Sequence, residues 1–206
     1  MRIAIPKETH PGENRVPIIP DMAKKLVQLG AEVVIEAGMG TGSGFPDEAY
    51  TEVGASVSTD RKDLFSSADV LLRLRKPEMD DIALMKRGCV HISYLDPFNE
   101  TALVSALKDA GVTSISMEMI PRTTRSQKMD ALSSQANLAG YQMVVEAAMA
   151  LPRIFPMMMT PAGTLKPANV FVIGAGVAGL QAIATAKRLG AKVTAFDTRP
   201  VVAEQV

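Results

Sequence analysis

A glycine-rich turn near the C-terminus has the residue types and spacing that bind a dinucleotide. Gly174, Gly176 and Gly179 stand between an apolar run and a segment that favours helix, and a second apolar run follows before Asp197. In a strand–turn–helix–strand unit, the first glycine permits a tight turn and the second lets backbone approach a pyrophosphate. The third lets the helix pack close to the strand. This context favours a dinucleotide-binding turn over an ordinary glycine turn.

The atoms that would hold the dinucleotide come from the start of the helix and from the end of the second strand. The amides of Val177, Ala178 and Gly179 would point at the phosphates from the positive end of a helix. The Asp197 carboxylate can accept hydrogen bonds from the adenosine ribose and would repel a 2′-phosphate, which favours NAD(H) over NADP(H). Arg199 weakens that preference, because a nearby arginine can accommodate the 2′-phosphate; its other interpretation is a solvated loop cation.

A second group of polar residues lies in the loop after an expected strand over 113–117. Ligands of open α/β sheets bind beyond the carboxyl ends of strands, so this loop would face a cleft between domains. Arg122, Gln127 and Asp130 could position a nicotinamide carboxamide and ribose without moving a proton. Ser133 would begin a long helix and face the same cleft. The alternative is a solvated, charged loop in which Ser133 is only an N-cap.

The composition excludes several other classes of protein. Lys and Arg together number 22, as do Asp and Glu, so the net charge is zero and no broad nucleic-acid footprint is expected. One cysteine and two histidines give neither a disulfide nor a metal-ligand cluster. The most apolar region, 141–160, is interrupted by charged residues and prolines, so we expect no membrane span. The N-terminus lacks the features of a signal peptide, which predicts a cytoplasmic protein.

The elements that would carry these residues alternate between strands and helices, which predicts α/β architecture with doubly wound parallel sheets. A glycine-dense loop over 38–44 lacks the ending of a P-loop, and we expect a flexible connection there. The other expected strands are 2–6, 32–36, 70–74, 90–95, 170–173 and 192–196, and the expected helices are 20–29, 79–86, 99–110 with Asn99 as N-cap, 133–151 and 180–189.

Prolines between the long helix and the glycine turn indicate a domain boundary in that crossing. We expect an N-terminal α/β domain over 1–132, a bridging helix and linker over 133–164, and a Rossmann domain over 165–206. We expect the sequence to hold only the first βαβ unit of that second domain. A two-stranded parallel unit would leave apolar edges exposed, which predicts poor solubility or association.

Several segments resemble the proton-translocating NAD(P) transhydrogenase family, in its soluble NAD(H)-binding alpha component. The run from Pro121 to Tyr141 carries the most specific resemblance, and the segments 155–160, 174–190 and 204–206 are similar to the same family. The segment 7–16 resembles a signature shared with the related alanine dehydrogenases. The similarity covers essentially the whole chain.

The resemblance implies a set of residues for NAD(H). Arg122, Gln127 and Asp130, with Ser133 alongside, would form the catalytic group at the nicotinamide. The cofactor-binding residues that it implies are Arg122, Thr123, Thr124, Gln127, Gly174, Gly176, Val177, Ala178, Gly179, Asp197, Thr198 and Arg199.

The resemblance also implies an activity and partners. In that family, hydride passes from NADH to NADP⁺ on a separate subunit, coupled to proton translocation by a membrane domain. Catalysis would then consist mostly of orienting two nicotinamide rings, with no side-chain acid or base. The implied partners are the NADP(H)-binding and membrane subunits and a second copy in a homodimer, with peripheral attachment to the inner membrane.

An alternative is an NAD-dependent alanine dehydrogenase, which needs an acid/base and a cationic clamp for a keto acid. Arg15 matches the substrate-binding arginine of that family. Arg75 stands where its substrate lysine is expected, and Asp96 stands where its catalytic histidine is expected. His91 lies within a predicted strand and is interpreted as a packed or hydrogen-bonded strand residue. These departures argue against amino-acid oxidation.

A further alternative is a truncated, non-catalytic module. In the resembling family the chain continues through the rest of the Rossmann sheet and a mobile loop over the nicotinamide. A chain lacking both would keep the first domain and its dimer surface without holding the cofactor tightly.

Overall fold

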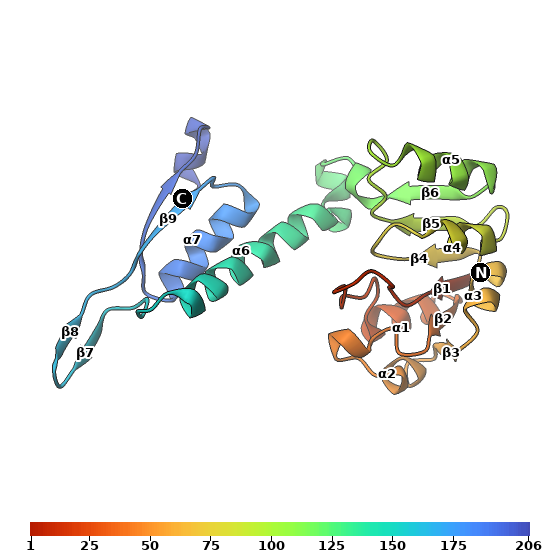
Figure 1. Cartoon of the computed structure of the whole chain (residues 1–206), viewed down its shortest axis with the longest axis horizontal. Coiled ribbons are helices and arrows are strands. Elements are labelled where there is room, and N and C mark those ends of the chain that lie inside the picture. The colour runs from red at the N-terminus through yellow and green to blue at the C-terminus, as the bar shows by residue number, and fades with distance from the viewer. The chain divides into compact units, whose positions relative to one another are not determined.

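The computed structural model describes residues 1–206 and divides them into two compact units, 1–129 and 130–206 (Figure 1). The division assigns the long helix, expected as a bridge, to the C-terminal unit. No helix combines the length and the apolar character needed to cross a membrane.

The N-terminal unit is built on a six-stranded sheet in which every neighbouring pair is parallel. The strand order is β3-β2-β1-β4-β5-β6, the order of a doubly wound sheet. The α/β prediction is therefore confirmed. The strands are β1 (Arg2–Ile5), β2 (Glu32–Glu36), β3 (Ser56–Ser58), β4 (Val70–Leu72), β5 (Val90–Ser93) and β6 (Thr113–Ser116).

Helices cover both faces of this sheet, because successive side chains of a strand point to opposite faces. Ile3 and Ile5 of β1 belong to one core cluster, and Ala4 between them belongs to the other. Helices α1 and α2 contribute to the first cluster, and α3, α4 and α5 to the second. The helices are α1 (Pro20–Gln28), α2 (Asp47–Thr51), α3 (Arg61–Ser67), α4 (Met79–Leu84) and α5 (Thr101–Asp109), with short 3-10 turns η1 (Thr41–Ser43), η2 (Met117–Met119) and η3 (Thr124–Met129).

Three features of this unit differ from expectation. The sequence pattern did not predict α2, β3 or α3. The prediction of Asn99 as N-cap is wrong, because Glu100 holds that position and the Asn99 amide donates to the Asp96 carboxylate at 2.9 Å. The loop over 38–44 is a packed turn: Met39 is buried, and the Gly38 amide donates to the Asp47 carboxylate at 2.9 Å. A flexible connection is therefore the wrong description.

The C-terminal unit holds the expected βαβ unit. Strands β9 and β10 pair in parallel, and α7 connects them. Helix α6 packs along α7, and a β-carbon added to Gly140 would lie 2.1 Å from the Ala178 carbonyl oxygen, so glycine is required at that contact. The elements are α6 (Ala131–Ala150), β7 (Met158–Thr160), β8 (Gly163–Leu165), β9 (Asn169–Ile173), α7 (Val177–Arg188), β10 (Lys192–Phe196) and η4 (Pro200–Glu204).

Asp130, rather than Ser133, caps α6. The Ser133 amide and hydroxyl donate to the two Asp130 carboxylate oxygens at 2.9 and 2.7 Å. Asp130 satisfies an amide that the first helical turn leaves without a partner. The expectation that Ser133 is the N-cap is therefore corrected.

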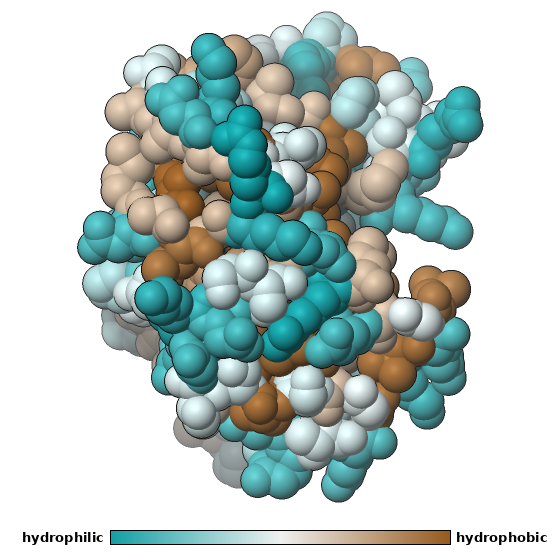
Figure 2. Space-filling model, turned by 90° about the vertical axis from the view of Figure 1, so that its right-hand side faces the viewer, coloured by the Kyte–Doolittle hydropathy of each residue, from teal (hydrophilic) through white to brown (hydrophobic).

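The apolar run 170–173 is typical of a buried strand, but β9 is exposed on one of its faces. Val172 is buried, but Phe171 is 61% exposed and Ile173 is 77% exposed, and Phe196 on β10 is 55% exposed. Each strand has only the other as neighbour, and the core lies on the face toward α7. Both strands have an open edge, as expected, and they expose apolar side chains on one face as well. The association expected from such exposure stays a prediction. On the face of the N-terminal unit in Figure 2, by contrast, hydrophobic side chains form only separate small groups among hydrophilic ones.

Candidate functional site

The glycine turn after β9 has geometry that demands glycine at two positions. Gly174 has φ of +88°, a left-handed conformation, and its amide donates to the Phe196 carbonyl at 2.7 Å. A β-carbon on Gly179 would lie 1.8 Å from the Gly174 carbonyl oxygen. The first and third glycines are thus explained by the turn and by the approach of α7 to it.

Gly176 is different, because nothing in the protein requires it. Its φ is −76°, and a β-carbon there would have a single neighbour within 4 Å, the Arg199 Nη2 atom at 3.8 Å. No side chain caps α7, so the amides of Val177, Ala178 and Gly179 are oriented as an uncapped helix start. This open space in front of a helix N-terminus fits a phosphate group.

Asp197 lies at the end of β10, beside this turn. Its carboxylate accepts the Ala175 amide at 2.8 Å and the Arg199 amide at 2.9 Å. The Arg199 side chain pairs with it as well, with Nε at 3.0 Å and Nη2 at 3.1 Å. The Arg199 hydrogen bonds, followed by the Ala175 amide, hold the pKa of Asp197 well below its usual range, so the carboxylate is ionised.

A cavity of about 340 Å³ adjoins Asp197. It is lined by Ala175, Ala195, Phe196, Asp197, Arg199, Pro200, Val202, Ala203 and Val206. The volume is at the lower end of the range for small-ligand sites. An apolar hollow with one carboxylate and one guanidinium fits an adenosine, whose ribose offers hydroxyl donors.

The second predicted group, in the loop before α6, is exposed for most of its length. Arg122, Thr123, Thr124 and Gln127 are all exposed, and the Thr123 hydroxyl bonds to the Ser126 hydroxyl at 3.2 Å. These four residues lie in the N-terminal unit, whereas Asp130 and Ser133 begin the C-terminal unit. Their joint action with the glycine turn on one nucleotide stays a prediction.

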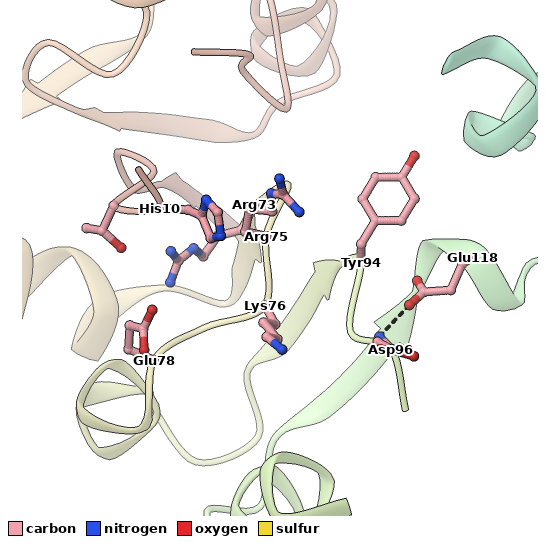
Figure 3. A pocket seen from close by; sticks show the side chains of 9 residues that line it. His10, Arg73, Arg75, Lys76, Glu78, Tyr94, Asp96 and Glu118 are labelled. Atoms are coloured by element: carbon pink, nitrogen blue, oxygen red, sulfur yellow. Dashed lines mark hydrogen bonds between the residues drawn. The ribbon is translucent and has the colours of Figure 1, made fainter. Parts of the chain in front are cut away.

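The N-terminal unit has a polar pocket of its own, about 260 Å³ in volume (Figure 3). It opens beyond the carboxyl ends of β1, β4, β5 and β6, at the switch point where doubly wound sheets bind ligands. From the sequence, Arg75 and Asp96 are considered as positions of this pocket. His10 and Glu118 are not identified there, although His10 follows β1 and Glu118 follows β6. Its lining residues are Thr9, His10, Arg73, Arg75, Lys76, Glu78, Tyr94, Asp96 and Glu118.

Carboxylates of the protein itself neutralise cations in and around this pocket. Glu13 binds Arg15 at 2.6 Å and Arg75 at 3.0 Å, and Arg15 lowers the pKa of Glu13 to about 2. Lys76 pairs with Glu100. A keto-acid carboxylate would have to displace these internal partners.

Arg73 connects the pocket to a buried chain of charges that the sequence did not predict. Arg73 is 3% exposed and binds Asp81 at 2.6 Å and Glu8 at 3.4 Å. Arg61 extends the chain, binding Asp81 at 2.8 Å and Glu36 at 2.5 Å. Each charge in the network has an opposite partner, which makes its burial tolerable. The ion pairs join the ends of β1, β2 and β4 to α3 and α4.

His91 is packed within β5, as expected. It is fully buried, and neither ring nitrogen has a hydrogen-bond partner. Burial, and then the charge of Arg73, lowers its pKa to about 4, so the ring is neutral at physiological pH. A residue in this position has no access to a substrate.

Comparison with known proteins places the whole chain in one family. The profile described as "Alanine dehydrogenase/PNT, N-terminal domain" matches residues 4–139, and the corresponding C-terminal domain profile matches residues 143–206. The chain belongs to the alanine dehydrogenase/PNT family. The resemblance to transhydrogenase alpha components in the sequence is thereby confirmed.

Within the alanine dehydrogenase/PNT family, the chain is more similar to transhydrogenases than to a solved dehydrogenase. It is 49% identical to an NAD(P) transhydrogenase subunit alpha protein of Rhodospirillum rubrum, over all of this chain and 55% of that protein. The transhydrogenase structure from Sinorhizobium meliloti matches with a TM-score of 0.97 and 51% identity, over all of this chain and 61% of that one. A structure of L-alanine dehydrogenase matches with a TM-score of 0.87 and 30% identity, covering 100% of this chain and 57% of that one. The chain thus spans about half the length of the curated relative.

Proposed function

We propose that this chain binds NAD(H) and serves as the NAD(H)-binding component of a transhydrogenase. The observation that carries the proposal is the open space at Gly176, flanked by the uncapped start of α7 and by the ionised Asp197. The first-turn amides would hold the diphosphate, and Asp197 would accept the adenosine ribose hydroxyls. Thr198 and Arg199, which follow Asp197 in the chain, would lie beside the adenosine ribose.

The reaction proposed is hydride exchange between NAD(H) on this chain and NADP(H) on a partner subunit. The bound nicotinamide supplies the hydride chemistry, and the protein's part is to orient the ring. Arg122 and Gln127, from the exposed loop, and the Asp130–Ser133 pair would position the nicotinamide end. Coupling to proton translocation, attachment to the inner membrane through partner subunits, and a homodimer belong to the same proposal and rest on the transhydrogenase relatives.

A fluorescence titration with NADH tests the proposal. We expect saturable binding by the chain, and a loss of affinity of about tenfold in Asp197→Asn, since hydrogen bonds to a charged group are among the stronger ones. Asp109→Asn, at the exposed end of α5, is the matched control and should bind as the wild type does. If NADH does not bind, or if Asp197→Asn leaves the affinity for NADH unchanged, the proposed site is refuted.

The same protein separates the alternatives by activity. Hydride exchange that requires an NADP(H)-binding transhydrogenase subunit supports the proposal. NADH formation that depends on alanine supports the dehydrogenase alternative. Absence of both, together with absence of NADH binding, supports a non-catalytic module.

A further inference from the structure

The Asp197 carboxylate has no acceptor position to spare. Oδ1 accepts the Arg199 amide at 2.9 Å and Nε at 3.0 Å, and Oδ2 accepts the Ala175 amide at 2.8 Å and Arg199 Nη2 at 3.1 Å. A carboxylate offers about four lone-pair positions, so this shell is full. A ribose diol needs acceptor positions on the same carboxylate.

Two of the four donors can leave and two cannot. The Ala175 and Arg199 amides belong to the backbone of the turn and of the loop after β10, so they fix the carboxylate in place. The Arg199 guanidinium is attached through a flexible side chain that is 60% exposed, whereas the Asp197 side chain is 11% exposed. The guanidinium is therefore the group that a ribose would replace.

A second position for the guanidinium lies close by. Arg199 Nη2 is the one atom within 4 Å of a β-carbon built on Gly176, at 3.8 Å. That glycine borders the space where the diphosphate would lie, in front of α7. Released from Asp197, the guanidinium can pair with a phosphate oxygen, for which its planar set of donors is well suited.

We propose that Arg199 is a displaceable occupant of the ribose subsite, which holds Asp197 while no nucleotide is present and transfers to the diphosphate when one binds. The inference rests on the proposed NAD(H) site and adds an internal competitor to it. Arg199 is then a positioning residue with opposite effects on the two halves of the ligand. It opposes binding of the ribose and favours binding of the phosphates.

Adenosine and ADP separate the two effects, because adenosine has the ribose diol without phosphate and ADP adds the diphosphate. Titration of the full chain, followed by NMR, gives an affinity for each. Arg199→Ala should bind adenosine about two- to fivefold more tightly than wild type, the scale of an exposed ion pair. In wild type, the diphosphate should make ADP bind more tightly than adenosine. Arg199→Ala should reduce this gain about tenfold, the scale of a charge-assisted phosphate contact.

Controls keep this test distinct from the test of the site itself. Arg188→Ala, at the end of α7, removes an exposed arginine of the same unit and should change neither affinity. If wild type binds neither adenosine nor ADP, the proposed NAD(H) site fails and the inference with it. If both bind and Asp197→Asn weakens both, the site stands. If the site stands but Arg199→Ala binds adenosine no more tightly than wild type does, the proposed displacement of Arg199 is refuted.

Discussion

The two histidines of the N-terminal unit lie in opposite surroundings. His91 is fully buried with both nitrogens lacking partners, whereas His10 is exposed in the polar pocket. Spacing in the sequence predicted that His91 packs in a strand. It could not predict the Arg73–Asp81 pair beside it, because that pair depends on how β4 and α4 meet in three dimensions.

His91 makes the stability of this unit depend on pH. Its pKa is about 4 in the folded protein and near 6.5 ordinarily, so between these values the unfolded chain binds a proton that the folded chain does not. Stability should therefore fall as the pH is lowered from about 6.5 to about 4, by on the order of 3 kcal/mol.

His91→Leu should abolish that fall, and His10→Gln should leave it intact. Urea denaturation at a series of pH values measures both variants against the wild type. An unchanged pH slope in His91→Leu would show that other groups cause it.

Among the elements, the glycine turn was the most predictable part of the site. The positive φ of Gly174 and the approach of Gly179 to its carbonyl follow from the spacing of three glycines between strand and helix. Gly140 was not predictable, because its need for a hydrogen side chain arises from contact with α7. Likewise α2, β3 and α3 are short elements without a long periodic pattern. Ser133 is the predicted cap of α6, but Asp130 provides it.

The second and third glycines of the turn should fail in different ways when replaced by alanine. Gly179→Ala places a methyl 1.8 Å from a backbone oxygen, so we expect a loss of about 1–3 kcal/mol in the stability of the C-terminal unit. The β-carbon of Gly176→Ala would have only Arg199 Nη2 nearby, at 3.8 Å, so this variant should fold normally. It should nevertheless weaken NADH binding, because the methyl group fills the phosphate space.

Thermal unfolding together with NADH titration distinguishes the two variants. Equal losses of stability would contradict the assignment of a packing role to Gly179 alone. Normal NADH affinity in Gly176→Ala would contradict the assignment of the phosphate space.

At the scale of the whole molecule, the architecture could be predicted, but not which side chains of β9 would be exposed. Alternating strands and helices indicated doubly wound sheets, and the N-terminal unit has that strand order. An apolar run indicates a buried strand, yet the burial of each face depends on what packs against it. Val170 and Val172 point to the face covered by α7, whereas Phe171 and Ile173 point to the opposite face and belong to no core cluster, so they are exposed.

This exposed strand face should make the chain associate. Exposed apolar patches on paired strands favour self-association, so we expect an apparent mass that rises with concentration in light scattering. The double variant Phe171→Thr and Ile173→Thr keeps β-propensity and should reduce the rise. Leu29→Thr, which removes an isolated leucine that is 83% exposed, should not. A double variant that associates as strongly as wild type would place the contact elsewhere.

The most direct measurement of the central claim is a crystal structure of the chain with NAD(H) bound. The account predicts the diphosphate at the amides of Val177, Ala178 and Gly179, the adenosine ribose on Asp197, and the Arg199 guanidinium turned from that carboxylate to the diphosphate. Coenzyme bound at another place, such as the polar pocket of the N-terminal unit, or a diphosphate that makes no contact with the start of α7, would contradict it.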